Sequence, residues 1–213
     1  MNLSKTYIQT ACWKQSASIQ MTLDNDFNVS DSKPDIERII QEKGRLNIQE
    51  IKPMNHKCLV RGTLEFAVLY TGDDGSGTLQ SMEGEIPFEE IFNMDGLQDQ
   101  DKMYVRWEME DLRSGMINSR KINIRSIIIL RVDAVRMADE EIATALPSGK
   151  NLWTKNEQIS LTLPYLQEKD QLRVREEILI PANHPNMMDI IWHQETLDHM
   201  NVKVQDGAIL ISG

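Results

Sequence analysis

The sequence predicts a mainly β protein: an antiparallel sheet or sandwich with a short proline-initiated helix, repeated in tandem with an incomplete second copy. Three observations lead to this class. Apolar and polar residues alternate over much of residues 19–132, which is the period of strands with one buried face. No helical pattern stands where a parallel crossover would need one. A shift of 151 positions also aligns residues 20–62 with residues 171–213 without a gap.

The first predicted strand is followed by a predicted helix. The apolar residues of the strand share one parity: Ile19, Met21, Leu23, Phe27 and Val29. Pro34 then suits the first position of a helix, and Asp35 and Glu37 would lie in its electrostatically favourable first turn. Gly44 would end this helix. Its apolar face would consist of Ile36, Ile39 and Ile40.

The middle of the chain predicts further strands. Even positions from 58 to 70 are apolar, and the segment TGDDGSG at 71–77 supplies the glycines that a hairpin turn requires. Alternation returns at 103–109. The last strand, 122–132, is apolar on both faces, so we expect it to be central in its sheet.

The repeat divides the chain into a first domain at 1–137, a linker at 138–154 and the start of a second repeat at 155–213. Pro34 aligns with Pro185, whereas Trp192 replaces Gln41. A partial copy would expose apolar strand faces and an open edge. We therefore expect it either to complete its sheet against the first domain or another chain, or to belong to a longer protein.

Charge and hydropathy exclude several classes of function. The chain carries 33 acidic and 23 basic residues, a net charge of -10, which disfavours nucleic acid as a partner. The longest aliphatic run, 127–130, is far shorter than the roughly 20 residues of a transmembrane helix. The first 15 residues lack the apolar stretch of a secretory signal. We expect a cytosolic protein whose two cysteines are reduced, with Cys58 buried and unreactive.

No catalytic, cofactor or metal site is predicted. His193 and Asp189 have a metal-ligand spacing, but no third ligand follows. The pair Asp73 and Asp74 lacks the alternating ligands of a calcium loop, and a solvated hairpin tip explains it better. Motifs of serine hydrolases, zinc proteases and phosphate-binding loops are absent from the sequence.

The candidate site residues concern interactions instead. Arg120 and Lys121 open an apolar strand, and either could pair with Asp35 or Glu37 to fix register or to form an interface. Trp192 in the second copy is a candidate for a contact surface or for core packing. The complete candidate set is Pro34, Asp35, Glu37, Arg120, Lys121, Pro185 and Trp192.

Five segments together resemble a known family, the SPOCS domain of SipL-type spore-coat morphogenesis proteins of clostridia. They are SKPDIERI at 32–39, VRGTL at 60–64 leading to VLY at 68–70, EIPFEE at 85–90, and NSRKI at 118–122. The resemblance spans roughly residues 17–137 and restarts at about 168. In the second copy Asn186 replaces Asp35 and His184 replaces Lys33.

The resemblance implies a cytosolic protein of the mother cell that assembles at the forespore surface and helps to attach the spore coat. It implies other coat morphogenesis proteins as partners, with self-association as a further expectation. SipL-like proteins use a C-terminal LysM domain to bind the ATPase of the coat basement layer, and no such domain is recognised in this sequence.

Three functional hypotheses remain open at this point. The first is a non-catalytic scaffold module in spore envelope assembly. The second is a carbohydrate- or peptidoglycan-binding β-sandwich, which needs a row of exposed aromatics although only 6% of residues are aromatic. The third is a hydrolase that uses the acidic pairs Glu83 with Glu85 and Glu89 with Glu90, which requires converging carboxylates in a pocket.

Overall fold

The computed structural model describes residues 4–75, 77–145, 155, 157–158, 160, 175, 177–196 and 199–212. These residues form eight strands and no helix, which confirms the mainly β, antiparallel class. The strands are β1 (Ser4–Asn28), β2 (Ile36–Met54), β3 (Lys57–Gly72), β4 (Leu79–Asn93), β5 (Lys102–Asn118), β6 (Lys121–Ala145), β7 (Asn201–Gln205) and β8 (Ala208–Ser212).

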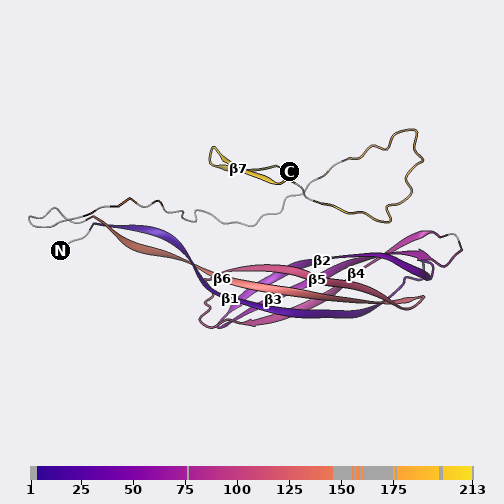
Figure 1. The fold of residues 1–213 in the computed structure, drawn as a ribbon, viewed down its shortest axis with the longest axis horizontal. Coiled ribbons are helices and arrows are strands. Elements are labelled where there is room, and N and C mark those ends of the chain that lie inside the picture. Colours follow the sequence, from indigo (N-terminus) through magenta and orange to yellow (C-terminus); the bar gives the residue numbers. More distant parts are fainter. Residues whose placement is uncertain are drawn as a thin grey trace, which may run out of the picture.

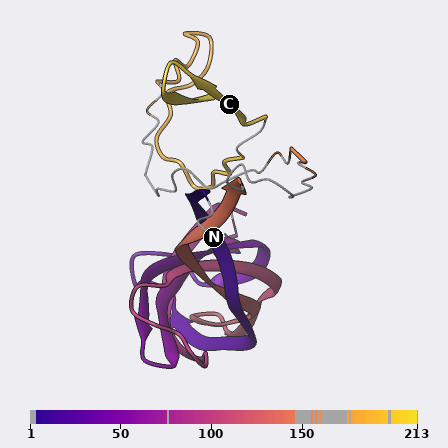
Figure 2. The same cartoon turned by 90° about the vertical axis from the view of Figure 1, so that its left-hand side faces the viewer.

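Strands β1 to β6 form two antiparallel sheets of three strands each, which face one another as a sandwich (Figures 1 and 2). One sheet has the order β1-β6-β5 and the other has the order β2-β3-β4. The strand predicted to be central is β6, and it does pair with a neighbour on each side. The apolar second face that predicted this position is half-buried at Ile127 and Ile129.

The hydrophobic core lies between the two sheets and is built mainly from their central strands. The sheets meet closely at Phe27 of β1 and Phe66 of β3, whose ring centroids are 4.5 Å apart in an edge-on arrangement. Residues of β3 and β6 with at most 1% exposure are Cys58, Val60, Leu64, Val68, Tyr70, Ile122, Ile124, Ser126, Ile128, Leu130, Val132 and Ala134. Their alternate spacing confirms the period of two read from the sequence.

The helix predicted after Pro34 is wrong, because Ile36–Met54 is strand β2. The register between β2 and β3 shifts directly after Ile36 and again directly after Ile39. Each shift is a bulge, where an extra residue changes which side chains face the core. Ile36 is buried and Ile39 packs against the core, although they are three positions apart, while Ile40 is exposed. A bulged strand has therefore produced a spacing that resembles one face of a helix.

Gly44 does not end a helix but allows β2 to approach β5. A Cβ atom at Gly44 would lie 2.8 Å from Cδ2 of Leu112 and 3.3 Å from Cε of Met109. Beside this contact, the hydroxyl of Ser114 donates a hydrogen bond of 3.1 Å to Oε2 of Glu42. One edge of each sheet is therefore closed against the other sheet.

Strand β6 extends beyond the predicted end of the first domain at residue 137. Residues 138–145 of the predicted linker continue β6 and pair with the start of β1 as a two-stranded ribbon. Figure 1 shows this ribbon projecting from the sandwich toward the N-terminal end. The remaining linker residues, 146–154, lie outside the described residues, and the division into domains otherwise stays a prediction.

The second unit, residues 155–213, is described only in part. Of residues 171–180, which the repeat aligns with the end of the first predicted strand, the structure describes 175 and 177–180, and these form no strand. Residues 185–196, where Pro185 was expected to start a helix, form neither helix nor strand. Two local features nevertheless recur at the sequence offset of 151. The backbone N of Lys33 donates to the carbonyl of Ser30 at 2.9 Å, and His184 N donates to Pro181 O at 2.9 Å.

The second recurring feature is a hairpin. Strands β7 and β8 pair Gln205 with Ala208, and at the offset of 151 the hairpin of β2 and β3 pairs Met54 with Lys57. Both hairpins have a two-residue turn with a positive φ at its second position, 61° at His56 and 76° at Gly207. The two hairpins therefore share turn length and register, although Asp206 has a positive φ of 52° at the first turn position and Asn55 does not.

Candidate functional site

The connection from β1 to β2 crosses from one sheet to the other and is fixed by the turn between β5 and β6. The backbone N of Val29 donates to Arg120 O at 2.8 Å, and Ile36 N donates to Ser119 O at 2.7 Å. Two of the segments that resemble the SPOCS domain, 32–39 and 118–122, are thereby brought together although they are far apart in sequence.

The guanidinium group of Arg120 is the centre of this arrangement. It donates to two carboxylates and three backbone carbonyls of the connection, at distances from 2.7 to 3.3 Å. The acceptors are Lys33 O, Val29 O, Ser30 O, Asp35 Oδ1 and Asp31 Oδ1. The planar guanidinium suits such a task because its donors are held in a fixed fork, which a lysine cannot reproduce.

Asp35 joins this centre to a third turn. Its carboxylate accepts hydrogen bonds from Ser119 Oγ at 2.7 Å and from Arg120 Nη1 at 3.1 Å. Its backbone carbonyl accepts from Asp73 N, at 2.8 Å, in the loop between β3 and β4. The hydrogen bond from Ser119 and the charge of Arg120 hold the pKa of this carboxyl below its usual value, against desolvation.

We call residues 29–36, 119–120 and 73 the connection cluster. It links three chain turns at one end of the sandwich, and the side chains of Arg120 and Asp35 are 34% and 45% exposed. The cluster can therefore fix the fold and remain accessible to a partner at the same time. Whether it is an interface stays a prediction.

The other candidates lie as follows. Pro34 packs on Gly72, where a Cβ atom would be 2.6 Å from Cγ of the proline. Lys121 pairs with Asp26 at 2.8 Å and not with the partners suggested from the sequence. Glu37 is exposed in the bulged start of β2, and Pro185 is exposed in the second unit.

Trp192 contacts the sandwich. Its ring centroid lies 4.8 Å from Nζ of Lys43 on β2. It is half-buried, whereas every other described residue of 177–196 is exposed.

Among the buried polar groups that sequence reasoning missed, two differ in how they are satisfied. The first is Tyr70, which is fully buried and whose hydroxyl has no hydrogen-bond partner among the described residues. Burial raises the pKa of this hydroxyl, and the charge of Arg120 opposes that shift. The alternation of β3 predicts a buried side chain at position 70, but no sequence signal predicts the unpaired hydroxyl.

The second missed group is Asp101, a fully buried carboxylate in the loop between β4 and β5. Arg136 Nε donates to Oδ1 at 2.8 Å, Gln98 N donates to Oδ2 at 2.9 Å, and Lys14 Nζ lies 3.4 Å from Oδ2. Burial pushes the pKa of Asp101 upward, but the hydrogen bonds from Arg136 and Gln98 outweigh burial and hold it below its usual value.

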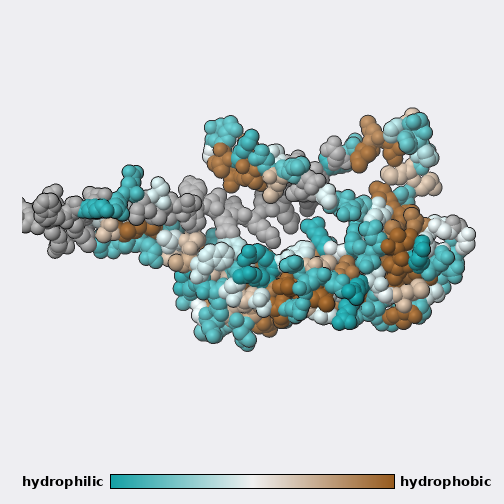
Figure 3. All heavy atoms as spheres, in the orientation of Figure 1, coloured by the Kyte–Doolittle hydropathy of each residue, from teal (hydrophilic) through white to brown (hydrophobic). Residues whose placement is uncertain are grey.

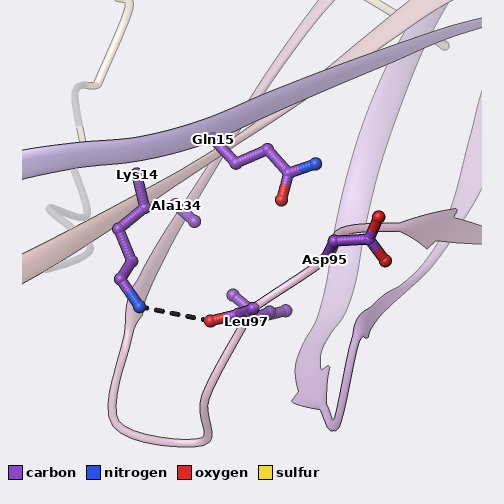
Figure 4. Close-up of a pocket in the computed structure, with 6 residues that line it drawn as sticks. Lys14, Gln15, Asp95, Leu97 and Ala134 are labelled. Carbon is purple, nitrogen blue, oxygen red and sulfur yellow. Dashed lines mark hydrogen bonds between the residues drawn. The ribbon is translucent and has the colours of Figure 1, made fainter.

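A small pocket of about 180 Å³ is lined by Lys14, the residue that also pairs with Asp101 (Figure 4). Lys14 Nζ donates to Gly96 O at 3.2 Å on its rim. Its lining residues are Lys14, Gln15, Asp95, Gly96, Leu97 and Ala134. The acidic pairs considered for hydrolysis are not part of this lining, and Glu89 is instead paired with Arg61 on the outer face of the sheet β2-β3-β4.

Metal and thiol chemistry find little support in the described part of the chain. Its His, Cys, Asp and Glu side chains include no group of three or more that could hold a metal ion. Cys58 is fully buried, as predicted. Burial raises the pKa of its thiol to about 11, so the thiol is protonated at neutral pH. The residues that the structure describes include no helix long and apolar enough to cross a membrane.

Comparison with known proteins bears on the first domain. Residues 35–117 match a family model described as SipL, SPOCS domain. Curated proteins and solved structures gave no match. The matched residues run from Asp35 of the connection cluster to the end of β5, and they confirm the resemblance over that stretch.

Proposed function

Because residues 35–117 carry a SPOCS domain of the SipL type, we propose that this protein is a non-catalytic scaffold module in assembly of the spore coat. The family match is the observation that carries the proposal. The protein would act in the mother-cell cytosol at the forespore surface, in contact with other coat morphogenesis proteins and with further copies of itself.

The arrangement of polar groups supports a binding role over a catalytic one. The connection cluster uses its charged groups to hold turns together, and the buried Asp101 is satisfied by three donors. The one carboxylate that lines the pocket, Asp95, has no second carboxylate beside it in that lining. A pair of carboxylates in one site is what glycoside hydrolysis requires.

The test combines localisation with coat attachment in the sporulating organism that carries this gene. A fluorescent fusion should form a shell around the forespore, and deletion of the gene should leave a coat that is detached or misplaced. A fusion that stays spread through the mother cell, together with a normally attached coat in the deletion strain, would contradict the proposal.

A second candidate function is binding of a carbohydrate or peptidoglycan fragment. It is favoured by two exposed aromatics of equal parity on β1: Tyr7, in the ribbon with β6, and Trp13, which is in register with Val135 of β6. The two candidates separate in a binding assay with peptidoglycan fragments. Loss of binding in the double variant Tyr7→Ser and Trp13→Ser would favour the second function, and absence of binding by the unaltered protein would exclude it.

A further inference from the structure

The contact between Trp192 and Lys43 joins two parts of the chain that are about 150 residues apart. Besides lying over the indole ring at 4.8 Å, Lys43 Nζ donates a hydrogen bond to the backbone carbonyl of His193. A cation over an indole is the strongest of the common cation–π pairs. One ammonium group makes both interactions. The Trp192 ring and the His193 carbonyl are therefore both held at the same point on β2.

Lys43 lies on the outer face of the sheet β2-β3-β4. It is in register with Ala67 of β3, while the next residue, Gly44, faces inward against Leu112. Ala67 is small, which leaves room beside Lys43 for a bulky ring. Lys43 and the ring of Trp192 therefore meet on the external surface of the sheet β2-β3-β4 and not in its core.

The sequence repeat aligns Trp192 with a residue on the same external surface as Lys43. At the offset of 151, Trp192 corresponds to Gln41 of β2, which is exposed and in register with Leu69. Gln41 and Lys43 are two positions apart on the same face of one strand. A tryptophan at the Gln41 position of a second sandwich would point away from that sandwich, toward a neighbour.

The two copies are complementary at this position. The first copy has the cation, Lys43, but glutamine at position 41. The second copy has the indole, Trp192, but glutamine at position 194, which corresponds to Lys43. Each copy therefore supplies one half of the contact, and neither copy can form it with an identical partner surface.

We propose that the second unit of this chain docks on the outer face of β2 in the first unit, with Trp192 over Lys43. The inference rests on the proposed scaffold function, since it defines how neighbouring modules of the scaffold are oriented. The tether between the units gives an effective concentration on the order of millimolar, which allows a small contact to be populated. Because Trp192 and Lys43 of one chain are both used in this contact, neither half is left free to bind a further copy.

The experiment uses the full chain labelled with 5-fluorotryptophan and observed by fluorine NMR. The sequence has four tryptophans, and the resonance of Trp192 is identified by its loss in Trp192→Phe. In Lys43→Met, which keeps the aliphatic stem and removes the charge, the Trp192 resonance should move and its solvent isotope shift should rise to that of a fully exposed indole. Lys43→Arg should retain the unaltered position to a large extent.

Lys52→Met is the matched control, because Lys52 is an exposed lysine on the same outward face of β2. It should leave the Trp192 resonance unchanged. A Trp192 resonance that does not respond to Lys43→Met, or that responds equally to Lys52→Met, would overturn the docking. A resonance that changes on tenfold dilution would overturn docking within one chain.

Failure of docking and failure of the scaffold function are distinguishable. The chain with Trp192→Phe and Lys43→Met can be followed by the forespore fluorescence described above. If the unaltered protein shows the NMR response but no shell at the forespore, the docking stands and the scaffold function fails. If the shell forms while the NMR response is absent, the docking fails and the scaffold function stands.

Discussion

The hairpin of β2 and β3 and the hairpin of β7 and β8 share turn position and register, yet they differ completely in burial. Val60 in the first is 0% exposed, whereas Ile211 at the equivalent position is 60% exposed. Cys58 and Ile209 differ in the same way, with 0% and 60%. Figure 3 shows apolar side chains of the β7–β8 hairpin at the surface.

The difference separates what local sequence determines from what distant strands supply. A two-residue turn and alternating apolar residues are enough to set the hairpin. Burial of β3 requires β4 beside it and the sheet β1-β6-β5 across the core. A two-stranded hairpin without such neighbours is marginally stable in water. Substitutions at equivalent positions should therefore have very unequal effects.

The largest expected effect is at the equivalent pair Val60 and Ile211. Val60→Ala should lower the free energy of unfolding by about 2–3 kcal/mol, because it leaves a cavity in a close-packed core. Ile211→Ala should change it by no more than about 0.5 kcal/mol. Both are measured by urea denaturation of the full chain. Equal losses at the two positions would show that the second hairpin belongs to the same core.

The next largest effect is a loss of folding stability in acid, which is due to carboxylates of the sandwich. The pKa values of Asp101 and Asp35 are held below their usual value in the folded protein. These carboxylates therefore stabilise the fold above the unfolded pKa of about 4, and this contribution is lost as the pH falls through the folded pKa values. The unfolding midpoint should fall steeply below about pH 4. Asp101→Asn should be less stable at pH 7 and should have a shallower decline in acid.

An unfolding midpoint that stays constant between pH 5 and pH 2.5 would contradict this account of the two carboxyl groups. So would an Asp101→Asn variant whose decline in acid is as steep as that of the unaltered protein.

The connection cluster gives a smaller but more specific comparison. Asp35→Asn installs in the first copy the residue that the second copy has at Asn186. The charged pair with Arg120 is lost, so the melting temperature should fall by roughly 2–5 °C. The reciprocal change Asn186→Asp should leave it unaltered, because Asn186 is exposed. A melting temperature unaffected by Asp35→Asn would mean that the backbone hydrogen bonds of the connection suffice without the carboxylate.

The smallest effect is expected at Tyr70. Tyr70→Phe removes a buried hydroxyl that has no partner among the described residues, so stability should stay equal or rise by up to about 1 kcal/mol. The comparison of urea midpoints checks this. A loss of stability would reveal a hydrogen bond to a buried water molecule.

The strands were predictable from sequence because burial of one face leaves a period of two. The parity of 58–70 placed Val60, Leu64 and Val68 in the core correctly. The error at 36–44 has a physical cause, since two bulges in β2 gave Ile36 and Ile39 a helical spacing. Bulges depend on how two strands pair, which the local sequence does not record.

The connection cluster was predictable only in part, where residues of opposite charge lie in segments that resemble the SPOCS domain. The contact of Arg120 with Asp35 was among the pairings suggested, but the three backbone carbonyls that Arg120 also binds follow from the path of the chain. The site of Asp101 could not be predicted, because Arg136 and Lys14 are distant in sequence and carry no local motif. Long-range approach of this kind is set by the topology of the two sheets.

The stability of residues 1–145 compared with the full chain tests most directly whether the sandwich is complete without the second unit. The core cluster is drawn from residues between Ala17 and Ala134, so the shortened protein should fold and show the same urea midpoint and the same slope as the full chain. A shortened protein that aggregates, or whose midpoint falls by more than about 1 M, would contradict the account, because it would place residues of the second unit in the core of the first.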